Sequence, residues 1–153
     1  MGSVTSGLGN LSSGFVPAFD RMDWARNAAT VARMLAAVSR GDVDGYLACV
    51  HDDVVYEAPY YAEMAPRRGR DELASMLTNL AARFASVSYE VTGTFETVDP
   101  NLVIAEVGGD NVVRDSDRRY RNHYVMFVHF RDDRVVHWTE YSNPMVYRDA
   151  TGD

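Results

Sequence analysis

The sequence predicts an α+β fold in which three helices, all from the N-terminal half of the chain, pack on a curved antiparallel sheet. Three observations lead to this prediction. Apolar residues recur with helical spacing early in the chain and again after residue 70, alternating strand patterns follow residue 86, and residues 119–145 have the composition of a long hairpin. No internal repeat or second domain is evident.

The first two helices are predicted from an apolar stripe and from capping residues. Residues 23–40 carry apolar side chains at alternating steps of four and three, with Asp23 as the expected N-cap and Gly41 after the last turn. Asp42 is expected to cap a second, shorter helix. The two helices should pack against each other through their apolar sides.

A short strand and a third helix follow. Residues 54–58 have strand composition and stop at Pro59, and residues 60–70 contain turn residues and three arginines, which is typical of a loop at the rim of a pocket. Asp71 and Glu72 suit the start of a helix, because acidic side chains stabilise a helix N-terminus.

The C-terminal half is expected to form the sheet. Residues 87–98 alternate as a strand, residues 102–107 form an apolar strand that Gly108 and Gly109 interrupt, and residues 110–118 form a polar connection to the hairpin. This arrangement places the helices on one side of the sheet.

The hairpin at residues 119–145 is expected to lie at the centre of the sheet, with a tight turn at 131–134. A tight turn sets Phe130 opposite Val135, and regular pairing then sets Val125 opposite Glu140. Strict alternation places these residues on one face: Arg121, His123, Val125, Phe127, His129, Val136, Trp138, Glu140 and Ser142. It places these on the other: Asn122, Tyr124, Met126, Val128, Phe130, His137, Thr139 and Tyr141.

Glu140 is the first candidate for an acid or a base. A carboxylate beside Trp138 and opposite Val125 is costly to ionise, so we expect its pKa to be raised. Two structural alternatives remain open: Glu140 pairs with Arg121 or His123, or the register slips by one residue and Glu140 faces water.

Composition excludes several classes of protein. The chain has 153 residues and a net charge of −7, without a basic stripe or a membrane-length apolar run, so we expect neither a nucleic-acid nor a membrane partner. All 15 basic residues are arginine, which excludes Schiff-base chemistry by lysine. The single cysteine, Cys49, is expected in the core. We predict a cytoplasmic protein with one domain at 19–148, between a flexible tail at 1–18 and a short tail at 149–153.

Neither a metal nor an organic cofactor is expected. The histidines of the hairpin are spread over two strands and two faces, and no zinc-type spacing of Cys and His occurs. Gly108 and Gly109 lie between strands and do not precede a helix as in a nucleotide site, and the chain has no serine-hydrolase nucleophile motif.

The sequence resembles the nuclear transport factor 2-like superfamily, and within it the SnoaL-like cyclases and especially the phenazine-biosynthesis A/B proteins. The likeness covers about residues 24–146. It is carried by the following segments: Arg26-Asn27 and Ala29-Thr30-Val31, Arg68-Gly69-Arg70, Phe95-Glu96-Thr97 and Asp99-Pro100-Asn101, Tyr120-Arg121-Asn122-His123, and Glu140 with Asn143-Pro144.

This resemblance implies a cone-shaped α+β barrel and an acid–base role for Glu140. It also indicates departures from two known mechanisms. The histidine that the phenazine family carries on the third helix falls on Met76, and the base of ketosteroid isomerases falls on Ala58. The chain is therefore expected to follow neither mechanism faithfully, because one superfamily hosts many chemistries in the same cone.

Two functions are compatible with these observations. The first is a cofactor-independent cyclase, isomerase or dehydratase of natural-product biosynthesis that acts on a small hydrophobic substrate bearing a carbonyl or an epoxide. Glu140 and His123 are its expected catalytic residues, because both could titrate near neutrality. The substrate is expected to contact six further residues: Tyr56, Met76, Tyr120, Arg121, Phe127 and Trp138. The second function is a non-catalytic binding or interaction module, which a cone filled by side chains would favour.

A homodimer is expected through the outer face of the sheet. The face predicted to carry Tyr124, Met126, Val128, Phe130 and Tyr141 is too apolar to be left in water, and members of the superfamily commonly dimerise there.

Overall fold

The computed structural model describes residues 18–152, with side chains described from residue 23 onward. The expected tail therefore lies outside the described residues, except for Ala18. The elements follow in this order: α1 (Ala18–Arg40), α2 (Val43–Leu47), β1 (Val50–Glu57), β2 (Arg67–Arg68), α3 (Gly69–Arg83), β3 (Phe84–Ser86), β4 (Tyr89–Phe95), β5 (Leu102–Val113), β6 (Arg119–Arg131), β7 (Arg134–Ser142) and α4 (Pro144–Thr151).

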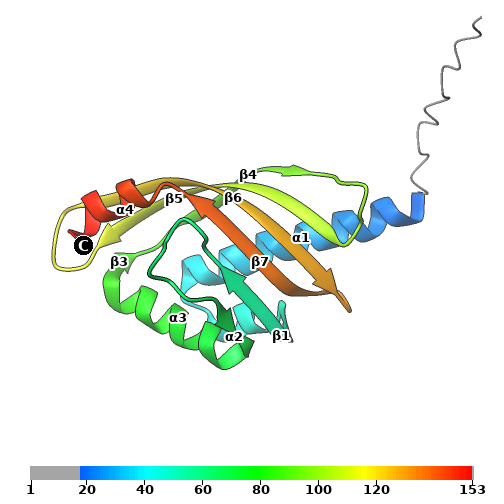
Figure 1. Cartoon of the computed structure of the whole chain (residues 1–153), viewed down its shortest axis with the longest axis horizontal. Coiled ribbons are helices and arrows are strands. Elements are labelled where there is room, and N and C mark those ends of the chain that lie inside the picture. The colour runs from blue at the N-terminus through cyan, green and yellow to red at the C-terminus, as the bar shows by residue number, and fades with distance from the viewer. Residues whose placement is uncertain (1–17, 153) are drawn as a thin grey trace, which may run out of the picture.

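The strands form one strongly curved sheet, and α1, α2 and α3 lie on its concave side (Figure 1). The strand order is β2-β1-β7-β6-β5-β3, and β4 also pairs with β5. This confirms the predicted α+β class. One feature differs from a purely antiparallel sheet, because β1 pairs with β7 in parallel.

The helices form where apolar spacing and caps predict them, with one shift at the start. α1 buries Val31, Leu35 and Val38 on one stripe. It begins at Ala18, so the prediction of Asp23 as N-cap is wrong, and Asp23 instead forms an ion pair with Arg26 one turn later. No helix of the described chain is long and apolar enough to span a membrane.

The other helix starts match the predicted chemistry. The side chain of Asp42 accepts a hydrogen bond from the backbone N–H of Gly45 at the start of α2. At the start of α3, the Glu72 carboxylate accepts a hydrogen bond from the backbone N–H of Arg68. Cys49 is buried, as expected, although it lies in the turn between α2 and β1.

The β5 strand is longer than predicted because the two glycines do not interrupt it. Gly108 and Gly109 pair with β4 on one side and with β6 on the other. A Cβ atom on Gly109 would lie 2.7 Å from the Tyr124 ring and 3.1 Å from the Tyr89 ring. Glycine is needed here because two aromatic rings pack directly on the backbone of the strand.

The β6–β7 hairpin contains a β-bulge that the regular register did not predict. Asp132 and Asp133 form the tight turn with positive φ angles, and Phe130 pairs with Val135 as expected. His129 then pairs with His137, so Val136 is the extra residue on β7. Every pairing beyond Val136 is shifted by one residue from the prediction.

The bulge corrects the predicted faces of β6. Tyr124, Met126, Val128 and Phe130 are buried on the concave face together with Trp138 of β7, and they do not form an outer face. The outer face instead carries these side chains of β6: Arg121, His123, Val125, Phe127 and His129.

The chain ends in a helix that the sequence interpretation missed. The side chain of Asn143 caps α4, Pro144 occupies its first turn, and Gly152 ends it with a φ of 77°. Ala150 is buried, so residues 149–151 belong to the folded domain and not to a tail.

The close packing at Gly109 gives the first prediction. We expect Gly109→Ala to lower the free energy of unfolding by about 1–3 kcal/mol, because the new methyl group must displace two packed rings. Gly108→Ala is the matched control, since its Cβ would lie 3.9 Å from the nearest side chain, that of Thr92. Urea denaturation of both variants measures the difference, and equal stabilities would contradict the packing argument.

Candidate active site

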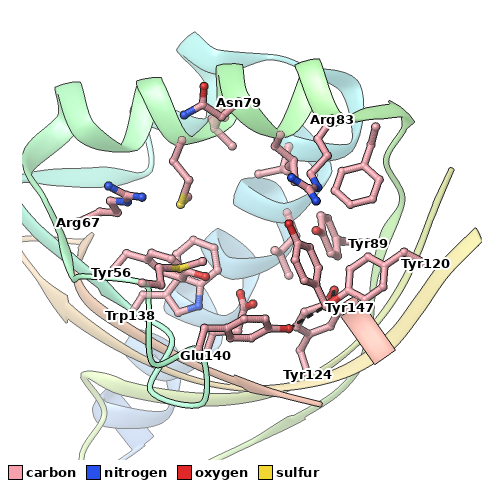
Figure 2. A pocket seen from close by; sticks show the side chains of 18 of the residues that line it. Tyr56, Arg67, Asn79, Arg83, Tyr89, Tyr120, Tyr124, Trp138, Glu140 and Tyr147 are labelled. Carbon is pink, nitrogen blue, oxygen red and sulfur yellow. Dashed lines mark hydrogen bonds between the residues drawn. The ribbon is translucent and has the colours of Figure 1, made fainter. Parts of the chain in front are cut away.

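A cavity of about 550 Å³ lies between α3 and the concave face of the sheet (Figure 2). Its wall is mostly apolar and aromatic, as is typical of small-molecule sites. The following residues line it: Leu35, Val38, Tyr56, Tyr61, Met64, Arg67, Met76, Leu77, Asn79, Leu80, Ala82, Arg83, Phe84, Tyr89, Tyr120, Tyr124, Met126, Trp138, Glu140 and Tyr147.

Glu140 projects from the sheet into this cavity (Figure 2). The bulge places its side chain on the concave face with Trp138, and it is the one acidic residue among the described residues that line the cavity. Burial raises the pKa of the Glu140 carboxyl from 4.5 to about 7, and a hydrogen bond with Tyr56 partly opposes this increase by lowering the pKa. The carboxyl group can therefore give or take a proton near neutral pH.

Within the described part of the chain, no cation neutralises Glu140. Arg121 forms an ion pair with Asp110 at 3.2 Å, and both it and His123 are exposed on the outer face. Neither can reach Glu140 through the sheet, so the structural alternative in which one of them pairs with Glu140 is wrong. The Glu140 side chain also lies on the concave side of the sheet, where it lines the cavity, and not on the outer face.

The groups around Glu140 are neutral hydrogen-bond donors and aromatic rings. The Trp138 ring packs edge-on against Tyr56 at 4.9 Å between centroids and lies 6.3 Å from the Tyr46 ring. The Trp138 indole N–H and the Tyr46 hydroxyl are buried without a hydrogen-bond partner among the described residues. Burial, and next the nearby Glu140, raise the pKa of both Tyr46 and Tyr56, so both hydroxyls stay protonated.

A second polar group in the cavity consists of linked tyrosine hydroxyls. The Tyr120 hydroxyl accepts hydrogen bonds from the Tyr124 hydroxyl at 2.9 Å and from the Asn122 side-chain amide at 3.0 Å. The Tyr61 hydroxyl lies 3.5 Å from that of Tyr120 and 3.0 Å from the Ser142 hydroxyl. Burial raises the pKa of Tyr61, Tyr120 and Tyr124, which keeps these hydroxyls neutral at physiological pH.

The structure brings five of the eight predicted site residues together. Glu140, Trp138 and Tyr56 lie on neighbouring strands, Met76 projects from α3, and Tyr120 lies at the far end of β6. Strict alternation in the predicted register placed Tyr120 outside, and the bulge explains why it lies inside.

The other three predicted site residues are placed wrongly. His123, Arg121 and Phe127 lie on the outer face because the bulge shifts β6 by one residue relative to β7. Phe127 packs there against the Tyr141 ring at 5.9 Å between centroids. His123 therefore cannot be the proton-transfer partner of Glu140 in this fold.

Several cavity residues were missed by the sequence interpretation. Tyr89 and Tyr124 lie on inward positions of β4 and β6, Tyr61 comes from the loop after β1, and Tyr147 comes from α4. The alternation of Tyr120, Asn122, Tyr124 and Met126 was a usable signal, because these four uncharged residues alternate with Arg119, Arg121 and His123 at the start of the strand. Tyr147 had no such signal, since α4 was not predicted.

No group of three or more potential metal ligands occurs among the described residues. His137 and Glu57 approach at 2.9 Å, but they lie on the outer side of β7 and β1 and do not line the cavity.

The chain belongs to the SnoaL-like domain family, whose model matches residues 31–138. Two relatives support the assignment. The chain is 27% identical over 124 residues to the PhzA/B-like protein PA3332 of Pseudomonas aeruginosa, covering 77% of this chain and 84% of that protein. It is 26% identical over 125 residues to the protein YesE of Bacillus subtilis, covering 80% of this chain and 85% of that one.

Solved structures show the same fold. A proposed isomerase from Bacillus subtilis aligns with a TM-score of 0.77 at 22% identity, covering 85% of this chain and 95% of that one. An epoxide hydrolase of M. tuberculosis aligns with a TM-score of 0.68 at 19% identity, covering 83% of this chain and 90% of that one. IdmH, a proposed polyketide cyclase from Streptomyces antibioticus, aligns with a TM-score of 0.69 at 19% identity, covering 83% of this chain and 99% of that one. The fold is thus shared by proteins to which different chemistries are ascribed.

The raised pKa of Glu140 gives a prediction about stability. A carboxyl whose pKa rises on folding binds its proton more tightly in the folded state, so its contribution to stability is complete below pH 4.5 and is lost as the pH rises through about 7. This loss is on the order of 3 kcal/mol at most, because a shift of one pKa unit is worth about 1.4 kcal/mol. We expect Glu140→Gln to be more stable than the parent protein at pH 8 by up to this amount.

The difference between the two proteins should shrink toward pH 4.5, which urea denaturation across this pH range measures. Glu90→Gln is the control, since Glu90 is exposed and does not line the cavity. A difference between Glu140→Gln and the parent protein that does not depend on pH would contradict the buried-carboxyl argument.

Proposed function

We propose that the protein is a cofactor-independent acid–base enzyme of natural-product biosynthesis, of the cyclase, isomerase or dehydratase type. In this proposal, Glu140 moves a proton on a small, mostly apolar substrate that bears a carbonyl or an epoxide. One observation carries the proposal: a carboxyl group with a pKa of about 7 and no cationic partner among the described residues projects into a cavity large enough for a small molecule.

The surroundings of Glu140 suit proton transfer. A general base is most effective when its pKa lies near the working pH, and burial provides that pKa here. The Tyr56 hydroxyl hydrogen-bonds to the carboxyl group, so it can orient the group and favour its ionised form. The apolar wall excludes water and holds the substrate in a reactive geometry, which is how the cavity itself contributes to the rate.

The comparisons favour this class of function over a non-catalytic module. Proteins of the same fold are described as an isomerase, an epoxide hydrolase and a polyketide cyclase, and the PhzA/B-like relative bears the name of a biosynthetic family. The cavity argues in the same direction, because a scaffold would fill its cone with side chains. Here the cone is hollow beside its buried acid.

The proposal predicts base catalysis on a probe that needs only a carboxylate in an apolar pocket. 5-Nitrobenzisoxazole is such a probe: a base removes its ring C–H proton, the N–O bond breaks, and the coloured 2-cyano-4-nitrophenolate forms. We expect the protein to accelerate this elimination, with a rate that rises with pH and levels off above an apparent pKa of about 7. Glu140→Gln should lower the rate about 100-fold.

Two further variants make the test specific. Glu90→Gln, an exposed change of the same kind, should keep the parent rate. Tyr56→Phe should raise the apparent pKa of the rate profile, because the lost hydrogen bond favours the ionised carboxyl. A rate that is the same in Glu140→Gln and in the parent protein would refute the proposed role of Glu140.

We also propose a homodimer through the outer face of the sheet, with a corrected set of residues. The side chains of Val125, Phe127 and Tyr141 lie side by side there on β6 and β7, and Tyr60 packs on Tyr141 at 5.3 Å between ring centroids. Val125 is 37% exposed and Tyr60 is 61% exposed, so this apolar face is accessible in the single chain. A second copy can cover it with the same surface.

The dimer proposal predicts that Val125→Asp yields a monomer. The two-fold axis would place one unpaired carboxylate from each copy in the buried interface, and burying these charges would destabilise the dimer. Val98→Asp is the control, since Val98 is 95% exposed in the turn after β4. Light scattering coupled to size-exclusion chromatography measures both masses. A Val125→Asp protein that keeps the mass of a dimer, or a parent protein that is already a monomer, would rule the interface out.

A further inference from the structure

Arg67 is placed on the inner face of the sheet by strand pairing. β2 pairs with β1 so that Arg67 lies beside Tyr56, and β1 pairs with β7 so that Tyr56 lies beside Trp138. Residues in such a row share one face. Arg67 therefore lines the same cavity as Glu140, and Figure 2 shows its guanidinium extending from β2 toward the cavity.

The Arg67 guanidinium has no protein partner among the described residues. Other arginines of this acidic chain pair with carboxylates, namely Arg26, Arg40, Arg70, Arg119, Arg121, Arg131 and Arg148. Arg67 is half-buried in the cavity wall, and no ion pair or hydrogen bond of its side chain occurs within the described residues. An unpaired guanidinium facing an apolar cavity is suited to an anion on a bound molecule.

Three charged side chains line the cavity: Glu140, Arg67 and Arg83. The Arg83 guanidinium lies over the Tyr147 ring, 5.3 Å from its centroid, whereas Arg67 is separated from Glu140 along the sheet. Two strand spacings of ~4.8 Å and one step of two residues along β7 lie between Arg67 and Glu140, so their backbones are roughly 12 Å apart. No arginine contributes to the pKa shift of Glu140, which agrees with this separation. A ligand that fills the space between them meets a cation at one end and an acid at the other.

We propose that the ligand of this cavity is an apolar, ring-containing molecule with one anionic group, a carboxylate or a group of the same geometry, bound by Arg67. The anion fixes the orientation of the ligand, because the opposite orientation would bring two negative charges together at the ionised Glu140. The reacting part then lies against Glu140. The role of this reacting end rests on the function proposed above, whereas the anion site does not.

Two fluorescent probes of matched shape test the anion site without any turnover. 1-Anilinonaphthalene-8-sulfonate carries an anion, and N-phenyl-1-naphthylamine has the same ring system without it. We expect Arg67→Gln to weaken binding of the sulfonate at least tenfold and to change binding of the neutral amine less than twofold. Arg68→Gln removes the same charge at an exposed site one residue away on β2. It should leave the affinity for both probes within twofold of the parent values.

A third variant locates the probes. Met76→Trp places a larger side chain in the cavity wall on α3 and should weaken binding of both probes together. Glu140→Gln should bind the sulfonate at least as tightly as the parent protein does, because it removes a negative charge from the same cavity, so a failure of the catalytic proposal leaves this result unaffected. Equal loss of sulfonate binding in Arg67→Gln and Arg68→Gln would show a general charge effect, and no loss in Arg67→Gln would show that the anion does not contact Arg67. Either outcome overturns the inference.

Discussion

A single extra residue, Val136, decides which way Glu140 points. Val135 faces the core, and with regular alternation His137 and Thr139 would follow it inward while Glu140 faced outward. The bulge at Val136 resets the alternation, so Trp138, Glu140 and Ser142 all face the concave side. The orientation of the Glu140 side chain therefore depends on a local irregularity in the backbone rather than on the strand pattern alone.

Packing around the bulge makes this irregularity the favourable arrangement. With the extra residue, Val135 and Trp138 are both buried, and the β6 side chains from Tyr124 to Phe130 join them in the core. Without it, either the apolar set of β6 or the apolar set of β7 would face water. Burial of these large side chains offsets the cost of holding one carboxyl group in an apolar cavity. The same hydrophobic packing that stabilises the sheet thus raises the pKa of Glu140.

The sequence predicted those features of the site that follow from local patterns. The sequence assigned Glu140, Trp138 and Tyr56 to the cavity. A glutamate beside a tryptophan on a central strand is costly to ionise, which indicates a role for the carboxyl group. His123 and Phe127 were assigned to the wrong face because alternation within each strand cannot show that one strand contains an extra residue. Tyr61 and Tyr147 come from a loop and a terminal helix, so their approach to the cavity depends on tertiary contacts.

Glu140 and Arg67 affect each other through any ligand that contacts both. An anion held by Arg67 adds negative potential to an apolar space that also contains Glu140, so binding such a ligand raises the pKa of Glu140 further. By linkage, the protonated protein then binds the anionic ligand more tightly than the ionised one does. A reaction in which Glu140 first takes a proton from the substrate therefore strengthens the hold on the anionic intermediate, and returning the proton weakens it again. Because the two groups are separated, the proposed anion site and the proposed base fit into one cavity.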